Sequence, residues 1–142
     1  RKHNADGVDA YLADNTSTPA LYKDPVNPAF SYAGTAPTIT VKWDDSADFE
    51  VNLERIITQK WIALYPNGQE AWTEWRRTGY PKLHPVGQNK SGGVISSTQG
   101  VRRLPYPISK LSAQDRANID KALILLGGAN TGATKVWWDK KN

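Results

Sequence analysis

Apolar residues recur at helical spacing in three segments of the chain. In the longest, Leu53, Ile57, Trp61 and Leu64 return every three or four positions, which places them on one face of a helix. Further apolar side chains widen this stripe, which indicates a helix enclosed by several neighbours. Two shorter segments carry the same period. We therefore predict helices at about 46–65, 68–77 and 113–126.

Polar and turn-forming residues mark where these helices begin and end. Each shorter helix starts with a polar residue and an acid three positions later, the spacing of a capping box: Asn67 with Glu70, and Ser112 with Asp115. Gly79 and Gly127 fit the left-handed position that follows a helix. For the long helix, we expect Asp44, Asp45 or Ser46 to cap the first turn, where acids also favour the helix dipole.

The rest of the chain is irregular in pattern. Residues 7–14 fit the end of a helix, and 38–43 alternate as a short strand would. Residues 15–42 contain four Pro, which disfavours a helix, yet they are too apolar for a disordered linker. We expect an ordered loop there. Pro residues in 94–108 limit any sheet in that segment to a small hairpin at an edge.

Composition and charge exclude several classes of protein. The net charge is +4, but Lys and Arg are scattered as pairs among acids, which argues against binding to nucleic acid. Without Cys, the segment can hold neither disulfides nor thiolate metal sites. It has no apolar run of about 20 residues that could span a membrane. Because it opens on Arg1 and not on Met, we expect it to be a piece of a longer protein.

Residue types that can support catalysis are present, but they do not form a recognisable catalytic motif. Four Glu residues fall one helical turn apart in two pairs, Glu50 with Glu54 and Glu70 with Glu74. Paired carboxylates can cleave glycosides, but on a helix we expect such acids to face water. His3 and His84 are too few for a histidine metal site and stand outside any triad-like motif. For Arg76 and Arg77, we expect one to pack across Trp72 or reach an acid, and the other to be solvated.

Several long motifs resemble one known family. The stretch IITQKWIALYPNGQEAWTEWRRTGYPKL strongly resembles the signature helix pair of SusD/RagB nutrient-binding lipoproteins. The later VRRLPYPIS and the ending LLGG followed by KVWWD resemble that family's C-terminal segment. The match extends over about residues 44–138, in the right order and spacing, and the resemblance is to SusD-like lipoproteins typical of gut Bacteroidetes.

The resemblance implies both a fold and a role. The fold would be mainly α with long irregular loops and at most a small β-hairpin, as the C-terminal part of a tetratricopeptide-containing α superhelix. The 142 residues would form a single C-terminal segment of it. Such proteins sit at the outer membrane through an N-terminal lipid anchor, which would lie outside this segment. They capture oligosaccharides, or in some members peptides, for a TonB-dependent SusC-like transporter. They are binding proteins and not enzymes, with no cofactor or metal implied.

The resemblance carries no ligand-binding residue onto this sequence, because the matched motifs are architectural. If the segment contacts the ligand, its loop aromatics are the best candidates, because Trp, Tyr and Phe rings stack on sugar faces. These are Tyr22, Phe30, Tyr32 and Tyr106. Two alternatives stay open: a structural piece without ligand contact, and a carboxylate-dependent glycoside hydrolase.

Two expectations about burial can be tested. The first follows from assigning residues 53–81 to packing. Trp61 and Trp72 should be largely inaccessible to solvent. In the tail, an exposed Val-Trp-Trp run would be a costly apolar patch. We therefore expect Trp137 or Trp138 to pack back onto the helices.

Overall fold

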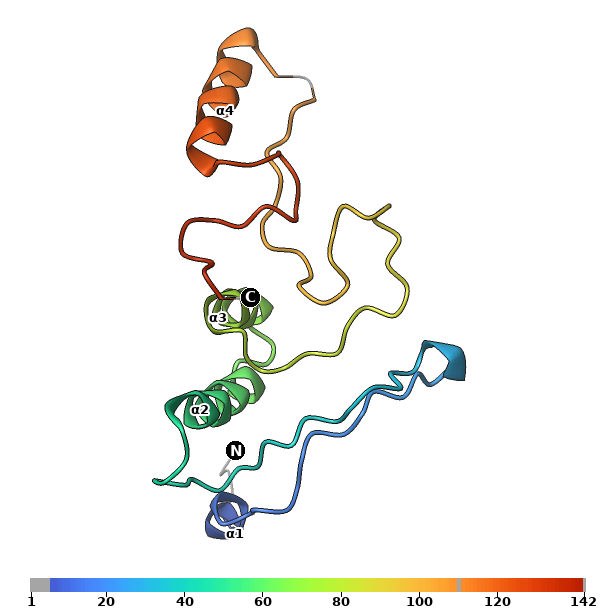
Figure 1. The fold of residues 1–142 in the computed structure, drawn as a ribbon, viewed down its shortest axis with the longest axis vertical. Helices are drawn as coiled ribbons and strands as arrows, with labels where there is room; N and C mark the ends of the chain where they lie inside the picture. The colour runs from blue at the N-terminus through green and yellow to red at the C-terminus, as the bar shows by residue number, and fades with distance from the viewer. Residues whose placement is uncertain (1–5, 110, 142) are drawn as a thin grey trace. The chain divides into compact units, whose positions relative to one another are not determined.

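Helices are the regular elements of the computed structural model, which describes residues 6–109 and 111–141. They are α1 (Val8–Leu12), the 3-10 helix η1 (Pro28–Phe30), α2 (Phe49–Ala63), α3 (Gly68–Thr78) and α4 (Ala113–Leu126) (Figure 1). In these residues the expected hairpin is reduced to one bridge between Ser96 and Gly100, and the predicted strand at 38–43 is irregular. The prediction of a mainly helical segment with long loops is confirmed.

The chain divides into two compact units, Arg1–Leu83 and His84–Asn142. The first contains α1, η1, α2 and α3, and the second contains α4 and the irregular segments on either side of it. His3 lies outside the described residues.

The start of α2 differs from the prediction. The helix begins at Phe49, three residues later than expected, and Asp48 is its N-cap without a side-chain cap bond. Asp44 instead accepts hydrogen bonds from the backbone N–H and the hydroxyl of Ser46, at 2.9 and 2.6 Å. Such local bonds from an Asp side chain form a turn that competes with the helix. The carbonyl of Asp44 then accepts from Asn52, at 2.8 Å, which ties the turn to the helix.

The other predicted helix ends are confirmed. The Asn67 side chain accepts from the N–H of Glu70 at 3.3 Å, and α3 runs one residue beyond the predicted 68–77. Gly79 ends α3 in the left-handed region, with φ of 78°. At α4, the Ser112 hydroxyl accepts from the N–H of Asp115 at 3.1 Å and donates to its carboxylate at 2.6 Å. These caps explain why both helices begin where the sequence indicates.

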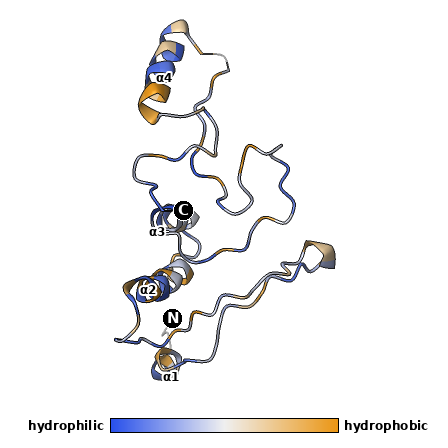
Figure 2. Cartoon of the chain, in the orientation of Figure 1, coloured by the Kyte–Doolittle hydropathy of each residue, from blue (hydrophilic) through white to orange (hydrophobic). Residues whose placement is uncertain are grey.

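Unusually few apolar side chains are buried. Among the described residues only Ile57 and Ala71 form a buried hydrophobic core, and both lie at the packed helix pair α2–α3. The 142 residues expose 10476 Å², whereas two separately folded chains of these sizes would together expose about 8,800 Å². The segment therefore leaves apolar faces open. At α4 they lie toward the C-terminal turns (Figure 2).

The two Trp residues of the helix pair are less buried than predicted. Trp61 and Trp72 are both half-buried, so the expectation that they are largely inaccessible is wrong for this segment. In the tail, Trp138 is half-buried, whereas Trp137 is 82% exposed. The widened apolar stripe of α2 remains uncovered, since Ile56 and Ile62 are more than half exposed.

Candidate functional site

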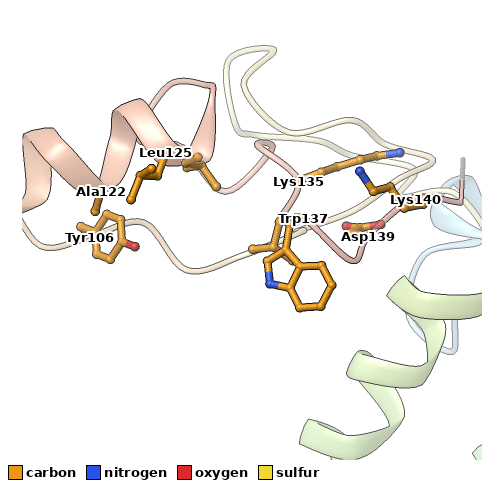
Figure 3. Close-up of a pocket in the computed structure, with 9 residues that line it drawn as sticks. Tyr106, Ala122, Leu125, Lys135, Trp137, Asp139 and Lys140 are labelled. Carbon is orange, nitrogen blue, oxygen red and sulfur yellow. The ribbon is translucent and has the colours of Figure 1, made fainter.

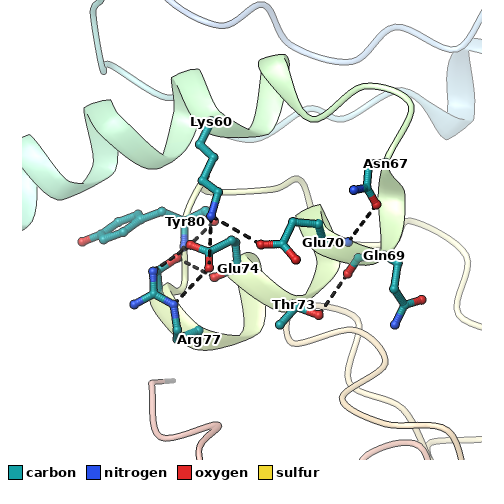
Figure 4. A network of polar contacts seen from close by, with 9 residues as sticks. Lys60, Asn67, Gln69, Glu70, Thr73, Glu74, Arg77 and Tyr80 are labelled. Atoms are coloured by element: carbon teal, nitrogen blue, oxygen red, sulfur yellow. Dashed lines mark hydrogen bonds and ion pairs between the residues drawn. The ribbon is translucent and has the colours of Figure 1, made fainter.

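A network of charges holds α2 against α3 (Figure 4). The Lys60 ammonium lies 3.5 Å from Glu70 and 3.4 Å from Glu74. Arg77 donates to both carboxylate oxygens of Glu74, at 3.2 and 2.7 Å. This hydrogen bonding from Arg77 is the main reason that the pKa of Glu74 is lowered, while partial burial opposes it. The network closes one side of the helix pair.

The prediction that the acids of this region face water holds for Glu50 and Glu70, which are exposed, and is wrong for the other two. Glu54 and Glu74 are buried, and the carboxylate of Glu54 pairs with Lys82 at 2.9 Å. Glu50 accepts a hydrogen bond from the Tyr80 hydroxyl at 3.1 Å. A buried carboxylate is retained when it is paired, because pairing offsets the cost of losing water. All four Glu residues of the two pairs therefore have structural partners.

This arrangement does not favour glycoside cleavage. A catalytic pair needs one carboxyl group with a raised pKa to donate a proton. The pKa of Glu74 is shifted in the opposite direction. Among the described residues, no group of His, Asp and Glu side chains is placed to hold a metal ion.

The two Arg residues at the end of α3 have the roles expected for packing. The Arg76 guanidinium lies 3.5 Å from the centre of the Trp72 ring, and Arg76 is buried. Arg77 is half exposed at its side chain and reaches Glu74. One arginine therefore covers Trp72 as expected, whereas Arg77 is half exposed and ion-paired with Glu74, so it is not simply solvated.

Three of the four predicted ligand-contacting aromatics lie in one loop. The loop 22–32 is closed by a hydrogen bond from the N–H of Tyr32 to the carbonyl of Tyr22, at 3.1 Å. Tyr22 and Phe30 are 47% and 43% exposed, and Tyr32 is half-buried. The Tyr32 ring lies against Gly34, where an added Cβ would come within 2.2 Å of its hydroxyl oxygen. We call residues 22–32 the aromatic loop.

Asp24 organises the interior of the aromatic loop. Its carboxylate accepts from the N–H groups of Val26 and Asn27, at 2.9 and 2.7 Å, and from the Tyr22 hydroxyl, at 2.8 Å. Its own N–H donates to the Ser31 hydroxyl at 3.0 Å. The bonds to Asn27 and Val26 are the main reason that the pKa of Asp24 is lowered, and the bond to Asp24 raises the pKa of Tyr22. An exposed loop is thus held in one conformation.

The fourth candidate, Tyr106, lies in the other unit and is held separately. Its backbone N–H donates to the Asn130 side chain at 2.8 Å, and its carbonyl accepts from the same amide at 2.9 Å. The Arg103 guanidinium lies 4.7 Å from the centre of the Tyr106 ring and donates to Asn130 at 3.2 Å. Asn130 is thereby bonded to Tyr106, which lies 24 positions earlier in the chain.

The centre of the second unit is an ion pair that the sequence pattern did not reveal. Arg102 donates through Nε to Asp139 at 2.7 Å and through Nη2 to the other carboxylate oxygen. Both side chains are almost completely buried. The backbone N–H of Arg102 also donates to the carbonyl of Gly132, at 2.7 Å. The pattern did not reveal this pair because Arg102 and Asp139 are 37 positions apart and no local spacing connects them.

Beside this ion pair, the second unit forms an open cavity of about 620 Å³ (Figure 3). It is lined by Tyr106, Ala122, Leu125, Leu126, Lys135, Val136, Trp137, Asp139 and Lys140. The indole of Trp137 extends out of the tail, and the side chains of Lys135 and Lys140 lie near one another (Figure 3). The expectation that Trp137 or Trp138 packs back did not say which of the two; Trp137 is the exposed one and Trp138 is half-buried.

Comparison with known proteins identifies the class of protein. The family model for SusD-like proteins, described as Susd and RagB outer membrane lipoprotein, matches residues 1–139. A chitin-binding SusD homologue from Flavobacterium johnsoniae is 47% identical, with a TM-score of 0.83. A SusD homologue from Bacteroides uniformis is 51% identical, with a TM-score of 0.86. One from Bacteroides thetaiotaomicron is 45% identical, with a TM-score of 0.84. No curated protein matches the chain.

The chain belongs to the SusD-like family of outer-membrane lipoproteins. The matches cover 96% of this chain for the Flavobacterium and B. uniformis proteins and 97% for the B. thetaiotaomicron one. They cover only 28%, 28% and 30% of those relatives' own chains. Within the described residues, the helices are too short or too polar to cross a bilayer.

Proposed function

We propose that this segment is part of a cell-surface protein that binds oligosaccharides and hands them to a TonB-dependent, SusC-like outer-membrane transporter. The observation that carries the proposal is membership of the SusD-like family. A relative described as chitin-binding shares 47% of the sequence over nearly the whole segment, which supports a glycan as the ligand. The family description as an outer membrane lipoprotein supports the location, with a lipid anchor holding the protein at the cell surface.

The aromatic loop supports direct contact between this segment and the sugar. A sugar ring has apolar faces of C–H groups and polar edges, so it binds where an exposed aromatic ring stands beside hydrogen-bonding groups. Tyr22 and Phe30 are partly exposed in a loop that Asp24 already holds in place. A pre-formed loop loses little conformational entropy on binding, which favours affinity.

A structural role without ligand contact is the second candidate. The stretch from Leu53 to Pro81, which carries the family resemblance, is built for packing. Its charged residues join α2 to α3, and Arg76 covers Trp72. If the ligand is held wholly by other parts of the protein, the aromatic loop can change without loss of binding.

The experiment that separates these candidates measures binding of oligosaccharides to the full-length protein by calorimetry. We expect affinity without release of shorter products, and a loss of about tenfold or more in affinity for Tyr22→Ala with Phe30→Ala, since two stacked rings at roughly 0.5–1.5 kcal/mol each together contribute about 1–3 kcal/mol. Val26→Ala, at the 88% exposed tip of the same loop, is the matched control.

Unchanged affinity in the double variant would favour the structural role for this segment. Release of shorter sugars during incubation would contradict a binding protein and revive the glycoside hydrolase alternative. Co-purification of the protein with its outer-membrane transporter after mild detergent extraction tests the proposed partner. Recovery of the protein alone, under conditions that keep other transporter complexes intact, would contradict the hand-over.

A further inference from the structure

The two units differ sharply in charge. Residues 84–142 contain nine Lys and Arg against three Asp and no Glu, a side-chain charge of +6. Residues 1–83 contain nine Lys and Arg against eleven Asp and Glu, a charge of −2. The modest net charge of the whole chain conceals this difference. A unit with a concentrated positive charge attracts anions and raises their local concentration.

Part of this charge lies at the open cavity of the second unit. Lys135 and Lys140 line it on the tail side (Figure 3). The carboxylate at this place, Asp139, is buried and bound at two points by Arg102. Among the described residues, no carboxylate lies within ion-pair distance of the two lysines. The Lys135 ammonium donates to the carbonyl of Lys141 at 3.3 Å, which positions it without neutralising its charge.

The same cavity presents aromatic rings on a rigid frame. The N–H of Asp139 donates to the carbonyl of Val136 at 3.0 Å, which closes a turn with Trp137 at its outer corner. The indole is 82% exposed, while Asp139 points inward. Tyr106 is 39% exposed and is held by Asn130 on both sides of its peptide unit. Two rings and two ammonium groups therefore border one hollow.

This combination fits a small charged ligand better than another protein surface. Lys is depleted from protein–protein interfaces because its ammonium group is costly to desolvate. When a saccharide carries carboxylates, these carboxylates and the Lys ammonium groups stay partly hydrated while one face of a sugar ring stacks on an indole. The cavity volume of about 620 Å³ lies in the range of small-molecule sites.

We propose that this cavity binds an anionic oligosaccharide, with a sugar ring on Trp137 and its carboxylates beside Lys135 and Lys140. The proposal rests on the function proposed above and adds the chemical class of one ligand and a second place on the chain where it binds. The aromatic loop, in the other unit, lacks this excess of positive charge.

The test compares tetragalacturonate with its methyl ester, which has the same rings without the charges, on the full-length protein. We expect the acid to bind about five- to tenfold more tightly at low salt, as two solvent-exposed ion pairs would give, and salt to reduce this ratio. Lys135→Gln with Lys140→Gln should remove the preference and keep binding of the ester. Trp137→Ala should weaken both. Lys121→Gln, on α4 outside the cavity lining, is the matched control.

Other results of these binding experiments would each contradict one part of the proposal. Equal affinity for acid and ester, or a preference that survives the lysine changes, overturns the anionic site but leaves oligosaccharide binding in place. If neither these sugars nor neutral chitooligosaccharides bind, the proposed function itself fails. Binding of anionic phospholipid vesicles that needs Trp137 and both lysines would assign the cavity to a membrane surface. Protection of Trp137 from N-bromosuccinimide in the unliganded full-length protein would show that other protein covers it.

Discussion

Arg102 and Asp139 form a two-point ion pair in which both side chains are almost fully buried, although 37 residues separate them. The pair joins the VRR motif to the WWD ending, two of the motifs that carry the family resemblance. Trp137 lies on the outside of the tail, because the turn that directs the Asp139 side chain inward directs the Trp137 ring outward.

Removing one partner of this pair should be strongly destabilising. Asp139→Asn leaves the Arg102 charge buried without its anion, and we expect a loss of about 3–5 kcal/mol in the free energy of unfolding. Denaturant titration of the full-length protein measures this, with Asp120→Asn on the exposed surface of α4 as the control. Combining Asp139→Leu with Arg102→Met should recover part of the loss. A change below 1 kcal/mol in Asp139→Asn would contradict a structural role for the pair.

Asn130 should contribute more to the stability of the fold than its exposure suggests. Its amide accepts from the N–H of Tyr106 and donates to the carbonyl of Tyr106, and it also accepts from Arg103. Asn130→Ala should cost about 1–2 kcal/mol, because these backbone groups lose their partner. The control is Asn118→Ala, which loses only a 3.2 Å bond from Gln114 on α4. Equal unfolding midpoints for the two variants would show that the bonds around Tyr106 are unimportant.

The order of the aromatic loop should depend on pH through Asp24. The pKa of Asp24 is lowered because its carboxylate accepts from Asn27, Val26 and Tyr22. A carboxylate with a lowered folded pKa contributes stability above its unfolded pKa of about 3.9 and loses it as the pH falls through the folded value. We therefore expect the loop to stay ordered from neutral pH down to about pH 4 and to loosen below it.

Amide chemical shifts of Val26 and Asn27, followed by NMR from pH 7 to pH 2, test this expectation. In Asp24→Asn the transition of these two amides should disappear. Asp14→Asn is the matched control, because Asp14 accepts from Thr16 and has a lowered pKa of its own. That control should leave the transition of Val26 unchanged. A midpoint above pH 4 in the unsubstituted protein would contradict the direction assigned to Asp24.

The apolar groove at the turn between α2 and α3 should be covered in the full-length protein. It measures about 520 Å³ and is lined by Trp61, Ile62, Leu64, Tyr65, Pro66, Gly68 and Ala71. A helix pair of this kind cannot bury its apolar face alone and stacks on neighbouring helices. The relatives are more than three times longer than this segment, which leaves room for such neighbours.

Thiol labelling can measure this cover, because the segment has no Cys of its own. In the full-length protein, Cys introduced at Ile62 should react at least about tenfold more slowly than Cys at Gln69, as protection by local structure predicts. Ile62 is 59% exposed in the segment described here. Equal rates at the two positions would show that the groove is open, and would make it a candidate ligand site.

The local features of the fold could be predicted well from sequence. Asn67, Ser112, Gly79 and Gly127 stand where the structure places the helix caps, because a cap needs only residues within one turn of each other. The start of α2 was predicted wrongly because Asp44 could bond either to the helix or to its own turn. Both choices are local, and the sequence does not rank them.

The arrangement of the candidate residues could be predicted only in part from sequence. Exposed loop aromatics could be named by residue type, and the structure brings Tyr22, Phe30 and Tyr32 into one loop. It places Tyr106 in another unit. The sequence predicted that Trp137 or Trp138 packs back but not which of them, because it gives no signal that the turn at Val136 directs the Trp137 ring outward. The difference in charge between the two units could not be predicted from sequence either, since it can be calculated only when the boundary at residue 84 is known.

The sequence by itself determined the family, the presence of the three longer helices and the caps of α3 and α4, since these depend on long motifs and on contacts between near neighbours. Tertiary structure alone decided which charges are buried, which aromatic rings face solvent and where the cavity lies. Arg102 and Arg103 stood out in the sequence only as one of several scattered basic pairs, yet each is bound to residues more than 20 positions away. Burial of a charge depends on a partner brought near by the fold, and spacing along the chain does not record such a partner.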